Sequence, residues 1–426
     1  MTKYLGIKYA EAERFGIPKL LEFSGTADPS ASHGPHHFQM GFGPGVGEVP
    51  GGSDDCLHLD VWLPDNCDEA KPVLVWIYGG GFEGGMTKSF DAGLLANEQD
   101  VVVVVVNYRV GFLGFGYLPG ELETNLGLRD VIRSVQWVQK NIGIFGGDSQ
   151  NITLLGESAG GFLATAAVAS KELKCFDFKL IAMSGAASRL VMVEDIERLT
   201  RDWLSKLGVR KISETDQFTS SELLSAQTAV IPRDFGQRNG ARVNALGVIL
   251  DSSLDNGVLE AHPFQSLSNS ISKVFLTTVE REMQTMRTYA PEAFESATEN
   301  SLVAEIASFA NSIDKGREIT SKYLSRYESP AMSREQILSD FIYRLPAARL
   351  AKVRKLKTWS LDFAPELASG RGKDVTLLFP KDSERVVQGR EFRNQVGQYA
   401  HSDTPGNIQE VDFDWLLDTW QGIERI

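Results

Sequence analysis

The stretch Asn151 to Phe162, NITLLGESAGGF, runs apolar for several residues and then turns on small residues around one hydroxyl. It contains Gly156-Glu157-Ser158-Ala159-Gly160, which fits the pattern G-x-S-x-G. In that pattern the serine lies on a strained turn between a strand and a helix, and its small neighbours let the backbone pack closely. The sequence therefore predicts a strand over 152–156, a helix over 159–170 and a nucleophile at Ser158.

A glycine cluster, YGGGF at 78–82, follows an apolar run about 80 residues before this turn. Consecutive glycines let backbone N–H groups turn toward a ligand without obstruction by a Cβ atom. Two such donors and the N–H of Ala159 would stabilise the oxyanion that forms when Ser158 attacks a carbonyl carbon. The combination favours catalysis over two simpler alternatives, a serine that only caps its helix and a flexible glycine loop.

Strand-like and helix-like segments alternate along most of the chain. This alternation indicates a mostly parallel sheet with helices on both faces. The polar, helical segments 186–270 and 283–355 are interpreted as insertions over the carboxyl edge of the sheet, where such proteins bind ligands. We expect one domain over 1–426, with strands over 57–63, 73–78, 101–108, 180–183, 273–278 and 358–363, and helices over 128–142, 195–207 and 414–420.

The charge, the cysteine count and the motifs of the chain argue against several classes of binding partner and cofactor. The formal net charge of −13 argues against nucleic acid and anionic membranes. The N-terminus shows no signal peptide, and Val101–Val106 is too short to span a bilayer. Three cysteines at unrelated spacings favour a reducing, cytoplasmic location. We expect no cofactor and no metal, because the chain lacks zinc-ligand spacing, a phosphate-binding loop and a dinucleotide motif.

Segments spread along most of the chain resemble the type B carboxylesterases, the cholinesterase-like branch of the α/β-hydrolases. The matching segments, in order, are YLGIKYAE (4–11), SDDCLHLDVW (53–62), WIYGGGF (76–82), NYRVGFLGF (107–115), NLGLRD (125–130), WVQKNIGIFGGD (137–148), FIYRLPAARLA (341–351) and YAHSDTPGN (399–407). The resemblance implies an α/β-hydrolase fold and a small-molecule ester as substrate. It also implies Gly80, Gly81 and Ala159 as the oxyanion donors.

One cysteine of this family is missing. The family commonly pairs the cysteine of its Asp-Cys-Leu segment, here Cys56, with a cysteine in an upstream Gly-Pro-x-Cys segment. The corresponding segment here reads SHGPHHFQ (32–39) and holds no cysteine. Cys56 therefore has no evident partner, which agrees with a cytoplasmic location.

In α/β-hydrolases the serine works with an Asp or Glu and then a His, in that chain order. The acid should lie just past a later strand that ends near the serine. The segment KVFLTTVEREM (273–283) supplies such a strand and two glutamates, Glu280 and Glu282. The resemblance favours Glu280, because Thr277 to Glu280 is similar to the family's Thr/Asn-x-x-Glu turn. Glu282 is the second candidate, and a solvated acidic turn without a catalytic role is the alternative.

The base is the point at which the chain departs from the family. The family's His-Gly-x-Glu pattern corresponds to RGKDVTLLF (371–379), so Arg371 stands in place of the histidine. An arginine stays protonated and cannot act as a general base near neutral pH. Of the six histidines only His401 follows both the serine and the acid, and the resemblance places it in a later loop. His401 is therefore either a late base or a surface residue.

Three functions remain open. The first is a serine hydrolase of carboxylic esters, weak if no histidine serves Ser158, since an oxyanion hole and binding alone give about 10³–10⁴ over water. The second is a non-hydrolytic enzyme, for elimination or cyclisation, that stabilises an enolate with the same donors. The third is a catalytically inactive binding module. The intact turn at Ser158 favours the hydrolase.

Overall fold

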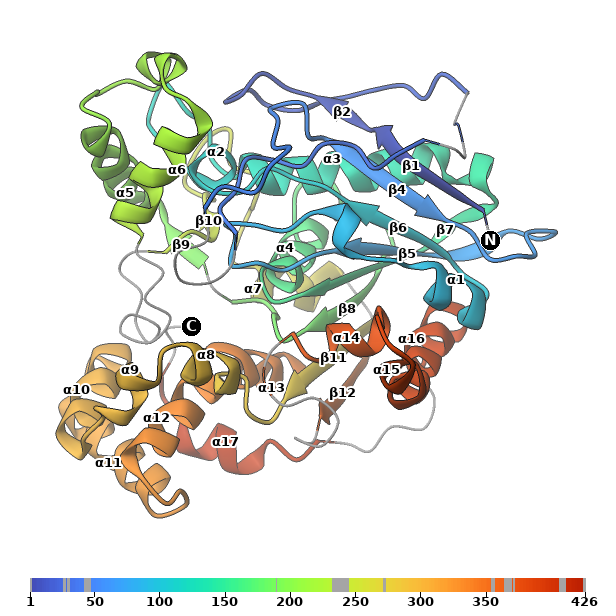
Figure 1. Cartoon of the computed structure of the whole chain (residues 1–426). Coiled ribbons are helices and arrows are strands. Elements are labelled where there is room, and N and C mark those ends of the chain that lie inside the picture. Colours follow the sequence, from blue (N-terminus) through green and yellow to red (C-terminus); the bar gives the residue numbers. More distant parts are fainter. Residues whose placement is uncertain are drawn as a thin grey trace.

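Eight strands form one sheet at the centre of the structure (Figure 1). β4 is antiparallel to β1 and β6, and every later pair of neighbours is parallel. In spatial order the strands are β1 (Lys3–Lys8), β4 (His58–Trp62), β6 (Val102–Val106), β5 (Lys71–Ile77), β7 (Gly147–Glu157), β8 (Lys179–Met183), β11 (Lys273–Val279) and β12 (Lys357–Phe363). The computed structural model describes residues 2–25, 28, 31–41, 47–188, 190–231, 245–270, 273–353, 357–363, 370, 372–405 and 411–423.

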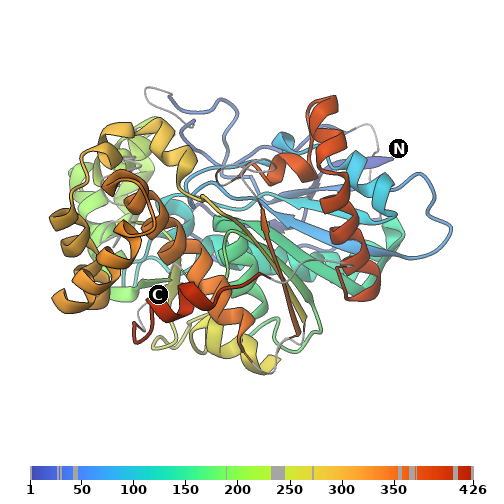
Figure 2. The ribbon, with the colours of Figure 1, turned by 90° about the horizontal axis from the view of Figure 1, so that it is seen from below.

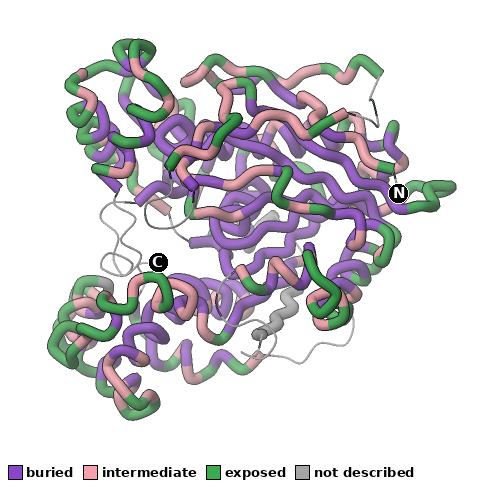
Figure 3. The backbone as a smooth tube through the Cα atoms, in the orientation of Figure 1, coloured by how far each residue is buried: buried purple, intermediate pink, exposed green. Residues whose placement is uncertain are grey.

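The middle strands are buried on both faces, as Figure 3 shows by their purple colour. Every residue of β6, a run of five valines, has no exposed surface. β-branched side chains suit this position, because they pack well on a pleated surface that is covered on both sides. The mostly parallel sheet confirms the predicted α/β class, and each of the seven predicted strands is present. β7 begins five residues before the predicted start at 152, and the other strands lie within two residues of their predicted bounds.

Helices cover both faces of the sheet (Figure 2). α3 (Leu126–Asn141) and α4 (Ala159–Val168) pack on one face, and α1 (Gly93–Gln99) and α16 (Arg390–Ser402) pack on the other. α3 turns an apolar stripe inward, since Val131, Val135 and Val138 are fully buried at helical spacing. The helices predicted over 128–142 and 159–170 are therefore confirmed as α3 and α4.

Two helical insertions follow the carboxyl ends of β8 and β11 and lie on the left in Figure 1. The first contains β9 (Leu190–Met192), α5 (Val193–Lys206), η3 (Ile212–Gln217), α6 (Ser220–Val230), β10 (Val248–Leu250) and α7 (Pro263–Ser270). The second contains α8 (Gln284–Tyr289), α9 (Pro291–Glu295), α10 (Glu299–Ala310), α11 (Ile313–Leu324), α12 (Pro330–Ser339), the π-helix η4 (Asp340–Arg344) and α13 (Leu345–Ala351).

The remaining elements are short. They are β2 (Ala10–Glu11), β3 (Lys19–Leu20), η1 (Thr87–Ser89), α2 (Phe112–Phe115), η2 (Ile142–Phe145), α14 (Val375–Leu378), α15 (Ser383–Gln388) and α17 (Asp414–Thr419). β2 pairs with β3, and β9 pairs with β10. The helix predicted over 414–420 thus corresponds to α17.

The N-terminal segment that lacks the family's cysteine is held by buried polar side chains. Cys56 is fully buried as a free thiol, and burial raises its pKa. His37, at the fourth position of the Gly-Pro-x-Cys-like segment, is 2% exposed, and its Nδ1 lies 2.9 Å from the carbonyl oxygen of Phe38. Burial, with a smaller contribution from the Arg109 charge, lowers the pKa of His37 to about 3.

The low pKa of His37 predicts acid sensitivity of the fold. Below about pH 6.5 the unfolded chain binds a proton at this imidazole, whereas the folded chain excludes it until about pH 3. The free energy of unfolding should therefore fall by about 3 kcal/mol between pH 6.5 and pH 4 through this group. In denaturant titrations the variant His37→Gln should lose less stability over this range than the wild type. Equal slopes in the wild type and in the variant would contradict the prediction.

Candidate active site

Ser158 lies between β7 and α4 in a conformation that few residues other than glycine adopt. Its φ is 53° and its ψ is −121°, and its N–H donates to the Met183 carbonyl at 2.9 Å. Its side chain makes no capping hydrogen bond to α4, although it occupies the N-cap position. The helix-capping alternative is therefore wrong. Strain of this kind persists only where the surroundings enforce it, and it holds the hydroxyl at the carboxyl edge of the sheet.

Glycines allow the turn to pack against the glycine loop, the segment 78–86 between β5 and η1. A Cβ atom on Gly79 would collide with the Glu157 carboxylate and lie 3.1 Å from the Ser158 Cβ. A Cβ atom on Gly160 would collide with the Ile77 carbonyl at the end of β5. The loop and the serine can come this close only because both positions lack a side chain.

The predicted oxyanion donors adjoin the contact between the glycine loop and the serine, since Gly80 and Gly81 follow Gly79 and Ala159 follows Ser158. Gly80 and Gly81 both have positive φ, 132° and 66°, and Gly81 is exposed. Ala159 is the first residue of α4, so its N–H has no partner within the helix. Among the described residues no hydrogen bond uses any of these three N–H groups. This arrangement can stabilise a negative oxygen beside Ser158.

The two candidate acids differ sharply in burial. β11 ends at Val279, after which Glu280 is exposed and Glu282 is fully buried. Glu282 Oε1 accepts a hydrogen bond from the Val279 N–H at 3.1 Å, which turns its carboxylate back toward the strand end. A carboxylate that orients a base must be held and shielded from water, so the geometry favours Glu282. The preference for Glu280 rested on the pattern of the turn, and of the two candidates it is Glu282 that is buried.

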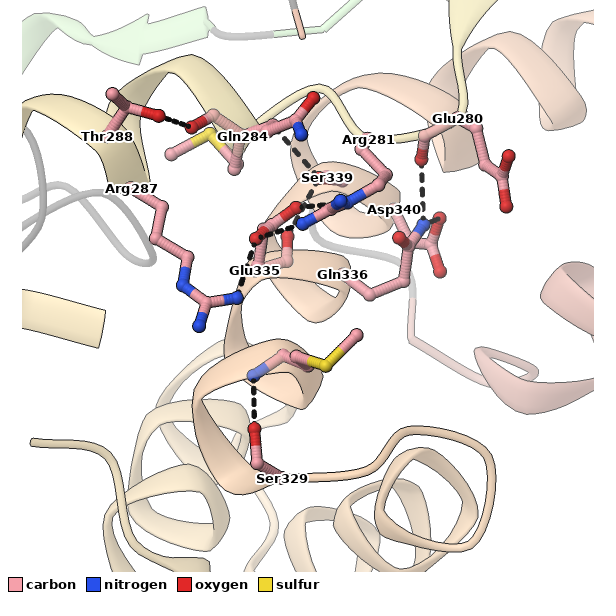
Figure 4. Close-up of polar contacts among 12 residues, drawn as sticks. Glu280, Arg281, Gln284, Arg287, Thr288, Ser329, Glu335, Gln336, Ser339 and Asp340 are labelled. Atoms are coloured by element: carbon pink, nitrogen blue, oxygen red, sulfur yellow. Dashed lines mark hydrogen bonds and ion pairs between the residues drawn. The ribbon is translucent and has the colours of Figure 1, made fainter. Parts of the chain in front are cut away.

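Helix α12 holds the turn that carries Glu282, as Figure 4 shows. Gln336 Nε2 donates to the Glu280 carbonyl at 3.1 Å, and the Met283 N–H donates to Ser339 Oγ at 3.0 Å. Arg281 forms two contacts of 2.7 and 2.9 Å with the Glu335 carboxylate, which is 2% exposed.

Each residue next to Glu282 is thus tied to α12. A second arginine, Arg287, reaches Glu335 at 3.1 Å. The sequence contained no signal for these contacts, because α12 lies about 50 residues after the turn.

His401 lies at the opposite edge of the sheet from Ser158. It is exposed in the last turn of α16, and its Nε2 lies 2.9 Å from the carbonyl of Gln99, just before β6 begins. The neighbouring Asp403 forms ion pairs with Lys179 and Lys273, the first residues of β8 and β11. His401 is therefore near the amino ends of the parallel strands, whereas Ser158 follows the carboxyl end of β7.

The other histidines contact residues other than Ser158. His33 Nδ1 contacts Asp60, and His58 begins β4, three strands away from β7 in the sheet. At about 4.8 Å between strands, that separation is roughly 14 Å. All six histidines lie in the described part of the chain, and no hydrogen bond there joins any of them to Ser158.

Arg371 lies outside the described residues, but its neighbour Gly370 does not. Gly370 is buried with a φ of +85°, and a Cβ atom there would collide with Thr285 Oγ1 in α8. Thr285 is three residues after Glu282. The described backbone thus brings the segment that resembles the base pattern next to the acid turn.

The described residues bear on two further points, a metal site and a membrane-spanning helix. In the described ranges, no three or more side chains of His, Cys, Asp or Glu come together in a way that could hold a metal ion. No helix within the described part of the chain has both the length and the apolarity needed to cross a membrane.

The comparisons with known proteins agree with this geometry. This chain is 33% identical to the para-nitrobenzyl esterase of Bacillus subtilis (strain 168) over 228 residues. The match covers 52% of this chain and 45% of that esterase. Over 207 residues, 44% of the chain, it is 34% identical to acetylcholinesterase 1 of Caenorhabditis briggsae, of which the match covers 33%. The chain therefore spans less than half the length of these relatives.

Solved structures extend the likeness in fold to nearly the whole chain. A PNB esterase superposes with a TM-score of 0.79 at 24% sequence identity, covering 96% of this chain and 89% of the esterase. A thermophilic PNB esterase gives the same values. The family model described as the carboxylesterase family matches residues 1–405. Because this model spans most of the chain, the chain belongs to the carboxylesterase family.

Proposed function

We propose that this chain is a serine hydrolase of carboxylic esters. Ser158 attacks the ester carbonyl, and the N–H groups of Gly80, Gly81 and Ala159 stabilise the oxyanion. Glu282 is the acid of the site in place of Glu280. The observation that carries the proposal is the strained, uncapped conformation of Ser158 directly beside the glycine loop.

We expect the hydrolysis to be slow. Arg371 stands where the family has its base, and a serine hydroxyl without a proton acceptor is a poor nucleophile. Binding and the oxyanion hole alone leave about 10³–10⁴ over water. The substrate is a small ester, and the cytoplasmic location suggested by the three unpaired cysteines remains a prediction.

A fluorophosphonate probe tests this function, because it reacts covalently with activated serines. We expect peptide mass mapping of the treated, folded protein to place the adduct on Ser158. Labelling should be slow, over hours and not minutes, and Ser158→Ala should remain unlabelled. A folded wild-type chain that stays unlabelled at high probe concentration would contradict the hydrolase and favour a binding module.

The arginine at position 371 favours one second candidate, a non-hydrolytic reaction that needs only a polarised carbonyl. In that reaction the donors of the glycine loop stabilise an enolate, and Ser158 forms no covalent intermediate. The variant Ser158→Ala separates the two functions. It should abolish turnover of p-nitrophenyl acetate by the hydrolase, whereas it should leave an elimination or cyclisation largely intact.

A further inference from the structure

The glycine loop is anchored to the sheet at its inner end. The hydroxyl of Tyr108 donates to the Tyr78 carbonyl at 2.7 Å, where β5 leads into the loop. The Gly111 N–H donates to the Phe82 carbonyl at 2.8 Å, just after the donor glycines. These contacts come from the segment that follows β6, so the start of the loop is held by its neighbouring strand.

The outer end of the loop is held by two side chains. Asn107 Oδ1 accepts a hydrogen bond from the Thr87 N–H at 2.9 Å, and Gln39 of the N-terminal segment holds Gly85. The Gly85 N–H donates to Gln39 Oε1 at 2.7 Å, and Gln39 Nε2 donates to the Gly85 carbonyl at 2.9 Å. Both polar groups of one backbone residue are thereby paired with one amide, as in a strand pair. Gln39 is 1% exposed and lies 46 residues before Gly85.

The surroundings select the orientation of this amide. Gln39 Nε2 also lies 3.3 Å from the His37 carbonyl oxygen, which can only accept a hydrogen bond, so the donor end of the amide faces an acceptor on this side as well. Gly85 has a φ of +129°, and a Cβ atom there would collide with the Tyr78 ring. Gly85 therefore fits between the Gln39 amide and the tyrosine only as glycine, and the loop has little freedom to shift while both contacts hold.

We propose that Gln39 is a positioning residue for the oxyanion donors, a proposal that rests on the proposed hydrolase function. The donor glycines lie in the turn Gly80–Glu83, in which the Glu83 N–H donates to the Gly80 carbonyl at 3.0 Å, and this turn stands between the contacts at Tyr78 and at Gly85. If the contact at Gly85 is lost, the turn is held only from the side of β6, and the N–H groups of Gly80 and Gly81 lose part of their fixed direction. Stabilisation of an oxyanion depends on donors that are fixed before the reaction.

Removal of the Gln39 amide, which makes both hydrogen bonds to Gly85, should lower the rate of acylation without weakening substrate binding. We expect Gln39→Ala to reduce kcat for p-nitrophenyl acetate and the rate of fluorophosphonate labelling about tenfold, less than the 10²–10³ for a lost donor. KM should change less than twofold. A matched control is Asn125→Ala, since Asn125 is fully buried and clamps Ile249 with the same pair of bonds, both 2.8 Å, away from the loop. Both variants should lower Tm, but only Gln39→Ala should lower kcat.

The conservative variant Gln39→Glu adds a test by pH. An ionised carboxylate cannot donate to the Gly85 carbonyl, whereas a protonated carboxylic acid can accept and donate like the amide. Burial raises the pKa of a carboxyl group. The labelling rate of Gln39→Glu relative to the wild type should therefore be lowest above pH 7.5 and recover at least fivefold by pH 5.5. A ratio that does not change with pH would overturn the clamp as a positioning device.

Hydrogen exchange of the loop amides separates this proposal from the function on which it rests. Peptides covering residues 79–87 should exchange faster in Gln39→Ala than in the wild type and in Asn125→Ala. Unchanged exchange, or faster exchange with wild-type kcat and labelling, would overturn the proposal. A wild-type chain that the probe does not label would contradict the hydrolase. In that case the positioning role falls with it, while the exchange data still decide whether Gln39 holds the loop.

Discussion

Replacing Arg371 with histidine is expected to raise the rate of ester hydrolysis by about 10²- to 10⁴-fold, the usual contribution of a general base. The family pattern has its base at this position, and the preceding residue, Gly370, belongs to the described part of the chain. Gly370 packs against Thr285 close to the Glu282 turn, and α12 holds that turn in place. An imidazole there would take the Ser158 proton and be oriented by a buried carboxylate.

The pH dependence should change with the substitution. In Arg371→His, the rate should fall as the pH drops through about 6.5, because a protonated imidazole cannot accept the serine proton. The wild type should lack this inflection. The two pH profiles are measured as rates of p-nitrophenyl acetate hydrolysis between pH 5 and pH 9, in the wild type and in Arg371→His. A fast wild-type enzyme with an inflection between pH 6 and pH 7 that His401→Ala abolishes would contradict this prediction and the placement of His401 away from the site.

Three further variants identify the partners of the new base. Arg371→Gln removes the cation without supplying a base, so it should stay close to the wild-type rate. In the Arg371→His background, Glu282→Gln should remove most of the gain, whereas Glu280→Gln should leave it within about threefold. A larger loss in Glu280→Gln than in Glu282→Gln would identify Glu280 as the acid. Equal losses in both variants would indicate that the turn acts as a unit.

Replacing Gly81 with valine is expected to lower hydrolysis of short acyl esters by 10²-fold or more, the scale of a lost oxyanion donor. The φ of Gly81 is +66°, which a β-branched residue avoids, so the backbone should rotate and turn the N–H away. A Cβ atom at Gly81 would meet no other described atom within 4 Å, so a steric clash does not explain the loss. Gly80→Val, at a φ of 132°, should behave in the same way.

The chain offers a matched control for this substitution. Gly120 has a φ of +76°, and a Cβ atom there would also meet nothing within 4 Å. Gly120→Val therefore carries the same backbone strain at an exposed turn away from Ser158. It should show a similar change in Tm and wild-type kcat. Wild-type rates in Gly80→Val and Gly81→Val would show that the glycine loop does not form the oxyanion hole.

Much of the fold could be predicted because its signals are local. A run such as Val102–Val106 has no polar face, so it can only be a strand buried on both sides, as the structure confirms. The apolar spacing of Val131, Val135 and Val138 indicated α3 in the same way. The turn at Ser158 was predictable for a similar reason, since small residues around one serine have few other uses between a strand and a helix.

The choice between neighbouring acids lay beyond the sequence. Glu280 and Glu282 are two residues apart on one turn, and local pattern cannot tell which carboxylate is buried. Burial there depends on Gln336 and Ser339, which hold the turn from a helix about 50 residues later.

By itself, then, the sequence determined the strands, several helices, the small-residue turn at Ser158, the glycine loop and the absence of a histidine at position 371. Only the tertiary structure decided which of Glu280 and Glu282 is buried, that His401 lies at the far edge of the sheet and that Gln39 holds Gly85. The reason is physical. Periodicity and turn chemistry act between residues a few positions apart, whereas burial and clamping arise from contacts between segments that meet only after the chain has folded.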